Sequence, residues 1–553
     1  MPPEEWRCTM VKALTLGLPG NLVGAGVALG LPADKLKDPQ GKALIQFFSK
    51  PCKPTRTNGQ RTRNLPAHDQ AKWQLYKNYN RQDVVTEQEI LRKLSIYKTP
   101  EDEQALWSLD QHMNDNGVRL DIPMVEKIVE YDTRRRQELQ EEAQELTGLK
   151  NPNSLAQLKR WLSEQGVEMA NVTKDTIAEA LQDPALPEVV RRVLEIRTAL
   201  GKTSVAKYST MLVAHCQDHR LRGILQFYGA NRSGRWAGRL VQTHNLAKNS
   251  LPDLALAREL AAEGDFDTMG TLFGETAFVF SELIRTAFIP SDGCRFIVSD
   301  FSAIEARVLA WLAGEEWVLE AFRNGEDIYC KTASMMYHVP VEKHGANSHL
   351  RQKGKVAVLA CGYQGGVGAM KRMDKGGTIP EDELQSVVDQ WRQANSKAVK
   401  LWRTCELAAR TAIEEHRTVR LKNGVAFGYI NGNLFIKLPS GRKLCYWDTR
   451  LKLDPRDGRE HIVYMGVNQE TKQWGETETY GGKLVENIVQ ATARDCLAIS
   501  MQRVAALGYN IVMHVHDEII VDCPIEDTGA MDRINACMAE PLSLIHISEP
   551  TRP

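Results

Sequence analysis

Hydrophobic and polar residues follow two different periods along the chain, and these periods predict the secondary structure. Apolar residues recur every three or four positions, with charges between them, in residues 73–94, 122–147, 155–165 and 481–501, which predicts amphipathic helices. Short β-branched and aromatic runs bounded by turn residues predict strands at 296–300 and 510–522, and several more across 424–480. The pattern predicts an α+β fold, and a length of 553 residues indicates several domains.

Two aspartates stand at the ends of predicted strands, although more than two hundred residues separate them. Asp300 closes the apolar run Phe296-IVSD and precedes a helical pattern, whereas Asp517 lies between the strand-like runs of Asn510-IVMHVHDEIIVD. Two carboxylates at strand ends can share a pair of divalent metal ions, and such two-metal sites serve phosphoryl transfer. The pair therefore indicates a nucleotidyl-transfer site.

A basic helix is predicted between these aspartates, in Arg351-QKGKVAVLACGYQGG. Arg351, Lys355, Leu359 and Tyr363 recur at every fourth position, and on one helix they would form a single slanting stripe. Residues 343–375 contain seven Lys or Arg and one acidic residue, a local net charge of +6 within a chain of zero net charge. A patch of this kind can bind phosphates, although a solvated helix face is the alternative interpretation.

Composition narrows the class of protein further. The eleven cysteines show no CxxC pair or Cys/His metal spacing, which favours free thiols in a reducing compartment. No stretch free of charges is long enough to span a membrane, and the N-terminus lacks a signal-peptide pattern. We therefore expect an intracellular protein with no membrane contact.

Three motifs carry a resemblance to a known family. DFSAIEAR at 300–307, RQKGKVAVLACGYQG at 351–365 and HVHDE at 514–518 resemble motifs A, B and C of the family A (DNA polymerase I type) DNA polymerases, with the phage branch as the nearest. The resemblance extends from about Trp6 to about Pro541. It implies a right-hand fold of palm, fingers and thumb, and a template-directed enzyme that adds dNTPs to a primer 3′-OH in phage DNA replication.

The resemblance assigns the metal ligands and their neighbour. Asp300, the backbone carbonyl of Phe301 and Asp517 would hold two Mg²⁺ ions, with Mn²⁺ as a substitute. Glu518 would lie beside the metals and act through water. The family also implies that Lys355 neutralises the triphosphate and protonates the leaving pyrophosphate.

Further residues would bind the incoming dNTP. Arg351 and Lys355 would contact its phosphates, Tyr363 would stack near the templating base, and Tyr329 stands where many relatives have a histidine. Leu359 replaces a common aromatic residue, so we expect strong discrimination against dideoxynucleotides, with core filling as the alternative role. Glu305 matches the steric gate against ribonucleotides. Together with Glu518 it argues against the related phage RNA polymerases.

Primer–template DNA is the second implied partner. By resemblance, Arg235 would read the minor groove of the terminal base pair, where all pairs offer acceptors. Gln242, Asn245 and Gln490 would contact nearby backbone or bases, and His516 would hold the primer terminus. His514 is expected to belong to the strand packing. The resemblance identifies no particular helicase, primase or processivity factor, and we expect a monomer.

We expect six segments along the chain. They are a remnant of a DnaQ-like 3′–5′ exonuclease domain (1–95), the thumb (96–222), the first part of the palm (223–314), the fingers (315–440), the second part of the palm (441–541) and a tail (542–553). Tyr79 and Asp83 fit the third motif of such an exonuclease, but the other carboxylates are lacking, so we expect no exonuclease activity. The tail resembles a translated sequencing adapter, which suggests a chain truncated at both ends.

Two alternatives stay open beside a phage replicative polymerase in the cytoplasm of an infected bacterium. One is a repair-type bacterial polymerase, against which the compact thumb and the segment Gly481-GKLVENIVQATARD argue. The other is a DNA-binding fragment without catalytic activity, because a truncated chain could fail to fold its palm. Primer–template binding without extension would distinguish that fragment from an enzyme.

Overall fold

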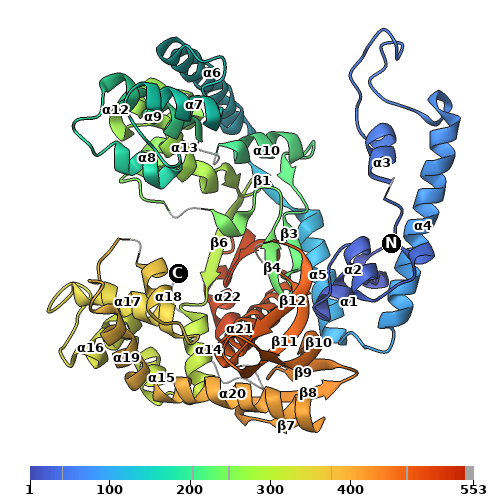
Figure 1. Ribbon diagram of the computed structural model, residues 1–553, viewed down its shortest axis with the longest axis vertical. Helices are drawn as coiled ribbons and strands as arrows, with labels where there is room; N and C mark the ends of the chain where they lie inside the picture. Colours follow the sequence, from blue (N-terminus) through green and yellow to red (C-terminus); the bar gives the residue numbers. More distant parts are fainter. Residues whose placement is uncertain (40, 202–204, 247–248, 375, 469–470, 542–553) are drawn as a thin grey trace.

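The computed structural model describes residues 1–39, 41–201, 205–246, 249–374, 376–468 and 471–541, so the predicted tail lies outside the described residues. An upper helical lobe, a lower helical lobe and an N-terminal arm surround a central region that contains the strand β6 (Cys294–Asp300) and the helix α21 (Gly481–Ala506) (Figure 1). The predicted mixture of helices and strands is therefore confirmed.

The palm sheet lies at the centre and brings the two aspartates together. Its three strands have the order β13 (Asn510–Val515), β14 (Glu518–Pro524) and β6 (Cys294–Asp300), all antiparallel. Ile297, Ile519 and Val521 are almost fully buried on these strands. Because β13 and β14 form a hairpin and β14 pairs with β6, the hairpin turn lies beside the end of β6.

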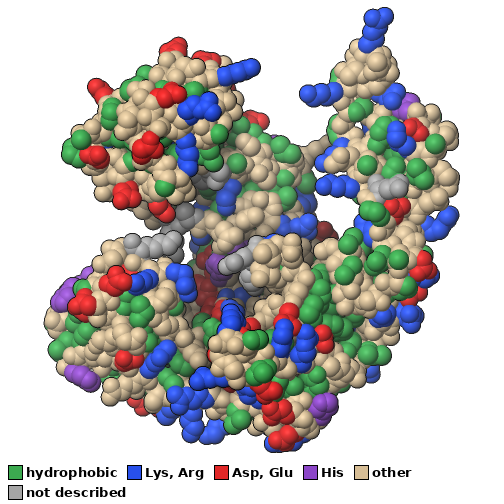
Figure 2. Space-filling model, in the orientation of Figure 1, with side chains coloured by type: hydrophobic (Ala, Val, Ile, Leu, Met, Phe, Trp, Pro, Cys, Tyr) green, Lys and Arg blue, Asp and Glu red, His purple; other side chains and the backbone are tan. Residues whose placement is uncertain are grey.

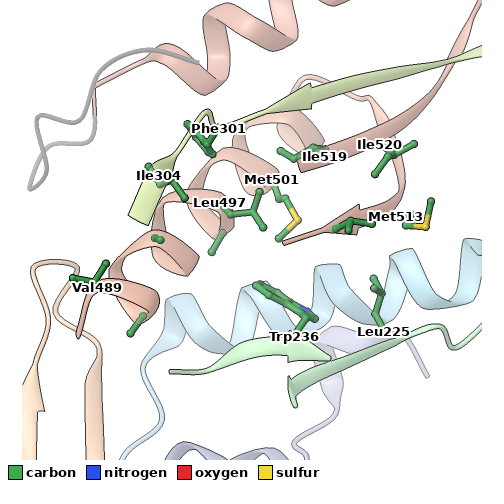
Figure 3. Close-up of a cluster of buried hydrophobic side chains, with 14 of the residues drawn as sticks. Leu225, Trp236, Phe301, Ile304, Val489, Leu497, Met501, Met513, Ile519 and Ile520 are labelled. Carbon is green, nitrogen blue, oxygen red and sulfur yellow. The ribbon is translucent and has the colours of Figure 1, made fainter. Parts of the chain in front are cut away.

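A long helix, α21 (Gly481–Ala506), packs beneath this sheet. Val489, Leu497 and Met501 of the helix belong to one buried cluster with Trp236 of β4 (Arg235–Gly238) and Ile519 of β14 (Figure 3). The sequence predicted this helix with an apolar face, but most of its residues are buried, on all sides. The buried side chains include the charged residues Arg494 and Asp495, so α21 is a core helix that also carries buried charge.

The described residues form three further sheets besides that of the palm. β3 (Leu225–Ala230) pairs with β4, and β1 (Val118–Leu120) pairs with β2 (Arg220–Leu221) and β5 (Phe288–Ile289). The β-rich segment predicted at 424–480 forms one antiparallel sheet with β7 (Val419–Arg420). Its other strands are β8 (Ala426–Ile430), β9 (Asn433–Lys437), β10 (Lys443–Asp454), β11 (Arg459–Val467) and β12 (Trp474–Thr479).

The upper lobe is helical and contains segments from two parts of the chain (Figure 1). The first part is α6 (Ile122–Thr147), α7 (Leu155–Glu164), α8 (Lys174–Ala180), α9 (Glu188–Gly201) and α10 (Ala206–Ala214). The second is α11 (Leu254–Glu263), α12 (Phe266–Phe273) and α13 (Thr276–Leu283), with α11 packed against α6. The lobe thus extends beyond the predicted thumb segment, and the domain boundaries stay predictions.

The lower lobe follows β6. It consists of α14 (Ile304–Ala313), α15 (Glu316–Arg323), α16 (Ile328–Tyr337), α17 (Leu350–Cys361), α18 (Val367–Met373), α19 (Leu384–Ala394) and α20 (Ser396–Glu415). Gly354 allows α17 to lie close to α16, because a Cβ there would come 2.3 Å from the carbonyl oxygen of Tyr329. This contact places the basic face of α17 beside the start of α16.

The arm contains α1 (Thr9–Thr15), α2 (Leu22–Ala28), α3 (Gly41–Ser49) and α4 (Gln70–Leu94), and its described residues form no strand. α5 (Glu101–Asn116) then leads into the palm core and ends at Gly117, whose φ of 62° stops the helix. The remaining elements are α22 (Ala530–Ala539), on the palm sheet, and short 3-10 turns.

Candidate active site

The backbone fixes the two aspartates at one edge of the palm sheet. Asp300 is the last residue of β6 and pairs in register with Glu518, the first residue of β14. The amide of Phe301 donates a hydrogen bond to the carbonyl oxygen of Asp517, at 3.2 Å. The structure therefore brings Asp300, Phe301, Asp517 and Glu518 to one place, as the sequence predicted.

Left-handed backbone conformations flank both aspartates. Ala303 has a φ of 52° in the turn from β6 to α14, and His516 has a φ of 54° in the hairpin turn before Asp517. Such conformations are costly for residues other than glycine and are concentrated at functional sites. Here they accompany the turn of the chain after Asp300 and the hairpin turn before Asp517.

The electrostatics of this edge fit a cation. Burial and then the neighbouring Asp300 carboxylate raise the pKa of Asp517 to about 7. Burial also raises the pKa of Glu518, and Arg285, 4.0 Å away, opposes that shift. A divalent ion would relieve the repulsion between carboxylates that are held together in this way. Oxygen ligands are also those that Mg²⁺ and Mn²⁺ prefer.

Glu305 connects the palm to the segment after α17. Its Oε1 accepts a hydrogen bond from Nη2 of Arg235 at 2.7 Å, and its Oε2 accepts one from the hydroxyl of Tyr363 at 2.8 Å. Burial and the Glu305 carboxylate together raise the pKa of Tyr363 well above its usual value. Three residues that the resemblance assigned separately to the sugar, the terminal base pair and the templating base thus form one cluster.

Tyr363 does not lie on the predicted helix. The fourfold spacing predicted one helical stripe of Arg351, Lys355, Leu359 and Tyr363. The helix α17 ends at Cys361, so that prediction is wrong for Tyr363. Gly362 and the glycines at 365 and 366 favour an early end of the helix. The tyrosine leaves the helix axis and reaches Glu305.

A cavity of about 450 Å³ opens between the lower lobe and the palm. Its lining includes Glu305, Leu359, Tyr363, Gln490 and Asp517. The side chain of Leu359 is 48% exposed, so the alternative that it fills a core is wrong. The cavity therefore joins four of the six predicted nucleotide-binding residues, Glu305, Tyr329, Leu359 and Tyr363, to Asp517.

The basic face of α17 begins at Arg351. Its Nη2 lies 2.8 Å from Oδ2 of Asp327, which also caps α16 by accepting from the amide of Tyr329. The guanidinium lies over the Tyr329 ring, 5.3 Å from its centre. Within the described residues, the Lys355 side chain makes no hydrogen bond or ion pair. Lys355 thus offers an uncompensated positive charge.

The predicted DNA-binding residues lie on the palm around the same edge. Gln242 and Asn245 are exposed next to β4, and the Asn245 amide donates to the Gln242 side chain at 3.3 Å. His516 is exposed at the hairpin turn, and its ring contacts that of His244 at 5.5 Å. Gln490 projects from α21 into the cavity. Gln490 and Asp517 thus line the same cavity, and His516 directly precedes Asp517.

His514 belongs to the core, as predicted from the sequence. It is 1% exposed and packs edge-on against Trp236, with ring centres 4.6 Å apart. Burial holds the pKa of His514 well below its usual value, and burial lowers the pKa of the neighbouring His244 to about 4. His514 is therefore neutral at physiological pH.

The predicted exonuclease pair lies apart from this site, on α4 of the arm (Figure 1). Tyr79 is buried, and Nζ of Lys37 lies 3.0 Å from Oδ2 of Asp83 and 5.0 Å from the centre of the Tyr79 ring. Lys37 thus contacts both Asp83 and Tyr79. The assignment of residues 1–95 to an exonuclease remnant stays a prediction.

Some residues that organise the site were missed by the sequence analysis. Asp327 precedes a helix, so a capping pattern could have indicated it, but its pairing with Arg351 depends on the fold. Arg285 and a buried group of charges made by Glu103, Arg442, Arg494 and Asp495 had no local signal. Asp454, Asp457 and His461 could together hold a metal ion on β10–β11, but Arg456 already pairs with Asp454.

Paired carboxylates at the edge of a palm sheet, with Asp517 lining a cavity beside a basic helix, point to the class of nucleotide polymerases. The family model for DNA polymerase family A matches residues 123–420. The DNA polymerase of Bacillus phage SP02 is 52% identical over 542 residues, which are 98% of this chain and 83% of that protein. The chain belongs to DNA polymerase family A and is a DNA-directed DNA polymerase, a nucleotidyltransferase.

Other relatives extend the comparison. The thermostable DNA polymerase I of Thermus aquaticus is 27% identical over 459 residues, 80% of this chain, which spans only 45% of that protein. The POL domain of Pol1 from M. smegmatis, in complex with DNA primer-template and dNTP, has the same fold. Its TM-score is 0.56 at 17% identity, with coverage of 97% of this chain and 81% of that one. No described helix has the length and hydropathy needed to cross a membrane.

Proposed function

We propose that this chain extends a DNA primer by two-metal nucleotidyl transfer, as the replicative polymerase of a phage. The observation that carries the proposal is the meeting of Asp300 and Asp517 at one sheet edge, beside the cluster of Glu305, Arg235 and Tyr363. The likeness to the SP02 protein supports the phage role, which would place the enzyme in the cytoplasm of an infected bacterium.

Asp300, the carbonyl oxygen of Phe301 and Asp517 would hold two divalent ions. When bound, Mg²⁺ or Mn²⁺ would offset the negative charge of the entering and leaving oxygens. Glu518 lies on the neighbouring strand position and would orient water at this edge. The strained turns at Ala303 and His516 keep the ligand oxygens in place before DNA arrives, which lowers the cost of assembling the site.

The basic face of α17 would receive the triphosphate. Lys355 has no competing partner among the described residues and would neutralise the phosphates and donate a proton to pyrophosphate. Nε and Nη2 of Arg351 both donate to Oδ2 of Asp327. Arg351 would exchange this carboxylate oxygen for a phosphate oxygen, since both are anionic acceptors that a guanidinium binds well. Tyr329, under the guanidinium, would keep Arg351 on the cavity side of α16.

Glu305 would act as the gate against ribonucleotides. Its two oxygens are held by Arg235 and Tyr363, so the carboxylate cannot swing away from a 2′-hydroxyl without losing a hydrogen bond. Leu359 would lie against the incoming sugar without an aromatic ring or hydroxyl. The gate selects deoxyribonucleotides, and the leucine disfavours dideoxynucleotides.

Primer–template DNA would lie on the palm between the two helical lobes. Arg235 would keep Glu305 on Nη2 and reach the minor groove of the terminal base pair with its other guanidinium nitrogens, while His516 would hold the primer end. Gln242, Asn245 and Gln490 would contact the neighbouring nucleotides. In this assignment residues 96–222 act mainly as the thumb, 315–440 as the fingers, and 223–314 with 441–541 as the palm.

Single-nucleotide addition tests the proposal. The purified chain is given a primer–template, Mg²⁺ and one dNTP at a time, with four templates that differ in the first unpaired base. The proposal predicts addition only of the complementary dNTP in each case. Primer–template binding with no addition from any dNTP would contradict it and would identify a DNA-binding protein without catalytic activity.

A further inference from the structure

The N-terminal arm carries a cationic loop that the proposed site does not use. Residues 50–64, called the basic loop here, connect α3 to the start of α4. Between Asp38 and Asp69 the chain has six Lys or Arg and no acidic residue. Since the chain has 70 acidic residues among 553, an average stretch of this length would contain about four. This stretch therefore lacks the acidic side chains that balance Lys and Arg elsewhere in the chain.

The cations of this loop are available to a ligand. Lys50, Lys53, Arg56 and Arg63 are exposed, and within the described part of the chain their side chains make no hydrogen bond or ion pair. Many exposed cations elsewhere in the chain do have a carboxylate partner, as Arg323 has in Glu316. Four free positive side chains within fourteen residues form a surface that attracts phosphates.

The loop is an ordered platform for these charges. The amide of Cys52 donates to the carbonyl of Thr62 at 2.8 Å and closes the base of the loop. Inside the loop, Nδ2 of Asn58 donates to the carbonyl of Lys53 at 2.8 Å, and the buried Asn64 amide donates to a carbonyl of α3 at 3.0 Å. A loop that is already ordered loses less conformational entropy when it binds a ligand.

The position of the arm identifies the ligand. The arm stands on the side of the palm opposite the lower lobe, and an open space separates it from the upper lobe (Figure 1). Lys and Arg side chains at the upper end of the arm project toward this space (Figure 2). Under the proposed function the lower lobe holds the incoming nucleotide and the upper lobe and palm hold the primer–template. The duplex behind the primer terminus would then lie toward the open space that the arm faces.

We propose that the basic loop binds the phosphate backbone of the duplex part of the primer–template, behind the primer terminus. This inference rests on the proposed function for the direction of the DNA. The contact would be independent of base sequence, because it involves backbone phosphates alone. It would hold the product while the upper lobe and palm release and rebind it, and so would raise the number of nucleotides added per binding event.

A fourfold neutralisation tests the loop. Lys50→Gln, Lys53→Gln, Arg56→Gln and Arg63→Gln are combined. The matched control exchanges Lys and Arg at the same four positions and keeps every charge. Arg61 stays unchanged, because it hydrogen-bonds to Asn64. Primer–template affinity is measured against salt concentration, with duplexes lengthened by one helical turn at a time.

The inference predicts that the logarithm of affinity of the neutralised protein depends less steeply on the logarithm of salt, by about 0.9 for each phosphate that the loop no longer neutralises. The reduction in affinity should occur only with duplexes long enough to reach the arm, and the control should bind like the parent. Equal salt slopes for neutralised and parent proteins would overturn the inference, as would a reduction confined to DNA with a lengthened single-stranded template.

Failure of the proposed function gives a different result. If the parent binds DNA but adds no nucleotide, the proposed function fails, yet the salt slopes still test the loop. If the parent extends primers and the neutralised protein adds as many nucleotides per binding event, the loop has no part in holding the product. Identical thermal unfolding of the three proteins shows that the comparison concerns binding and not folding.

Discussion

Glu103 of α5 accepts a hydrogen bond from Nη2 of Arg494 of α21 at 2.9 Å, across 391 positions of the chain. Both side chains are buried, and Nε of Arg494 also donates to the carbonyl of Gly234 at 3.1 Å, directly before Arg235. A buried ion pair therefore holds the turn from which Arg235 reaches Glu305. Residues before the upper lobe thus stabilise the palm.

The substitution Glu103→Gln should destabilise the protein strongly. It would leave Arg494 and the nearby Arg442 with too little negative charge in a buried place, which costs about 3 kcal/mol or more. The free energy of unfolding in urea measures the effect. Glu316→Gln, which breaks an exposed ion pair with Arg323, is the control and should cost well under about 1 kcal/mol. Equal destabilisation by the two substitutions would contradict this account.

Removal of the Glu305 side chain should weaken sugar selection. Glu305→Ala opens space at the proposed 2′ position and frees both Arg235 and Tyr363. The loss of such a contact changes the difference in transition-state free energy between two substrates by about 1–3 kcal/mol. The preference for dNTP over rNTP should therefore fall by on the order of tenfold or more. The ratio of kcat/KM for the two substrates measures it. An unchanged ratio would show that Glu305 is not the gate.

Dideoxynucleotides should be poor substrates of the parent enzyme. Leu359 is exposed at the cavity and brings no aromatic hydroxyl to the sugar. The substitution Leu359→Tyr should therefore improve use of ddNTP relative to dNTP by on the order of tenfold, about 1.4 kcal/mol of transition-state binding. Competition between the two nucleotides on one template measures the ratio. Equal use of both by the parent would refute the prediction.

Stability should fall below about pH 6.5 because of His514. Burial depresses its pKa in the folded protein, next to the positive Arg494 and the histidines 244 and 516. Below about pH 6.5, His514 binds a proton in the unfolded chain but stays neutral in the folded protein. The free energy of unfolding therefore decreases as the pH falls, by up to about 1.4 kcal/mol per pH unit. His514→Phe should reduce that slope in urea unfolding between pH 6.5 and 5. An unchanged slope would contradict the assignment.

Much of the catalytic edge could be predicted from the sequence, because its signals are local. Asp300 and Asp517 each end or adjoin a strand-like run, and a strand period places such residues at a sheet edge without knowledge of the whole fold. The four-residue spacing of the basic residues Arg351 and Lys355 in α17 is likewise a pattern within one short stretch of sequence. The family resemblance then joined these segments, which are distant in the sequence.

The remaining features depend on contacts between distant segments. The helix α17 ends at Cys361, before Gly362, and the Tyr363 hydroxyl donates a hydrogen bond to Glu305. A spacing of four residues does not indicate where the helix ends. The pairing of Glu103 with Arg494 joins two helices whose separate patterns predict only amphipathic surfaces. The helices α11–α13 belong to the upper lobe because α11 packs against α6, and the hydrophobic pattern of either segment alone does not indicate that contact.

The most direct test of the account compares chemistry with binding in Asp517→Ala. Primer extension in Mg²⁺ and the Kd for primer–template are measured for the parent and the variant, with Asp457→Ala, on the exposed β10–β11 turn, as the control. The account predicts extension by the parent and the control, and loss of extension in Asp517→Ala with little change in Kd. Extension by Asp517→Ala at the parent's rate would contradict it.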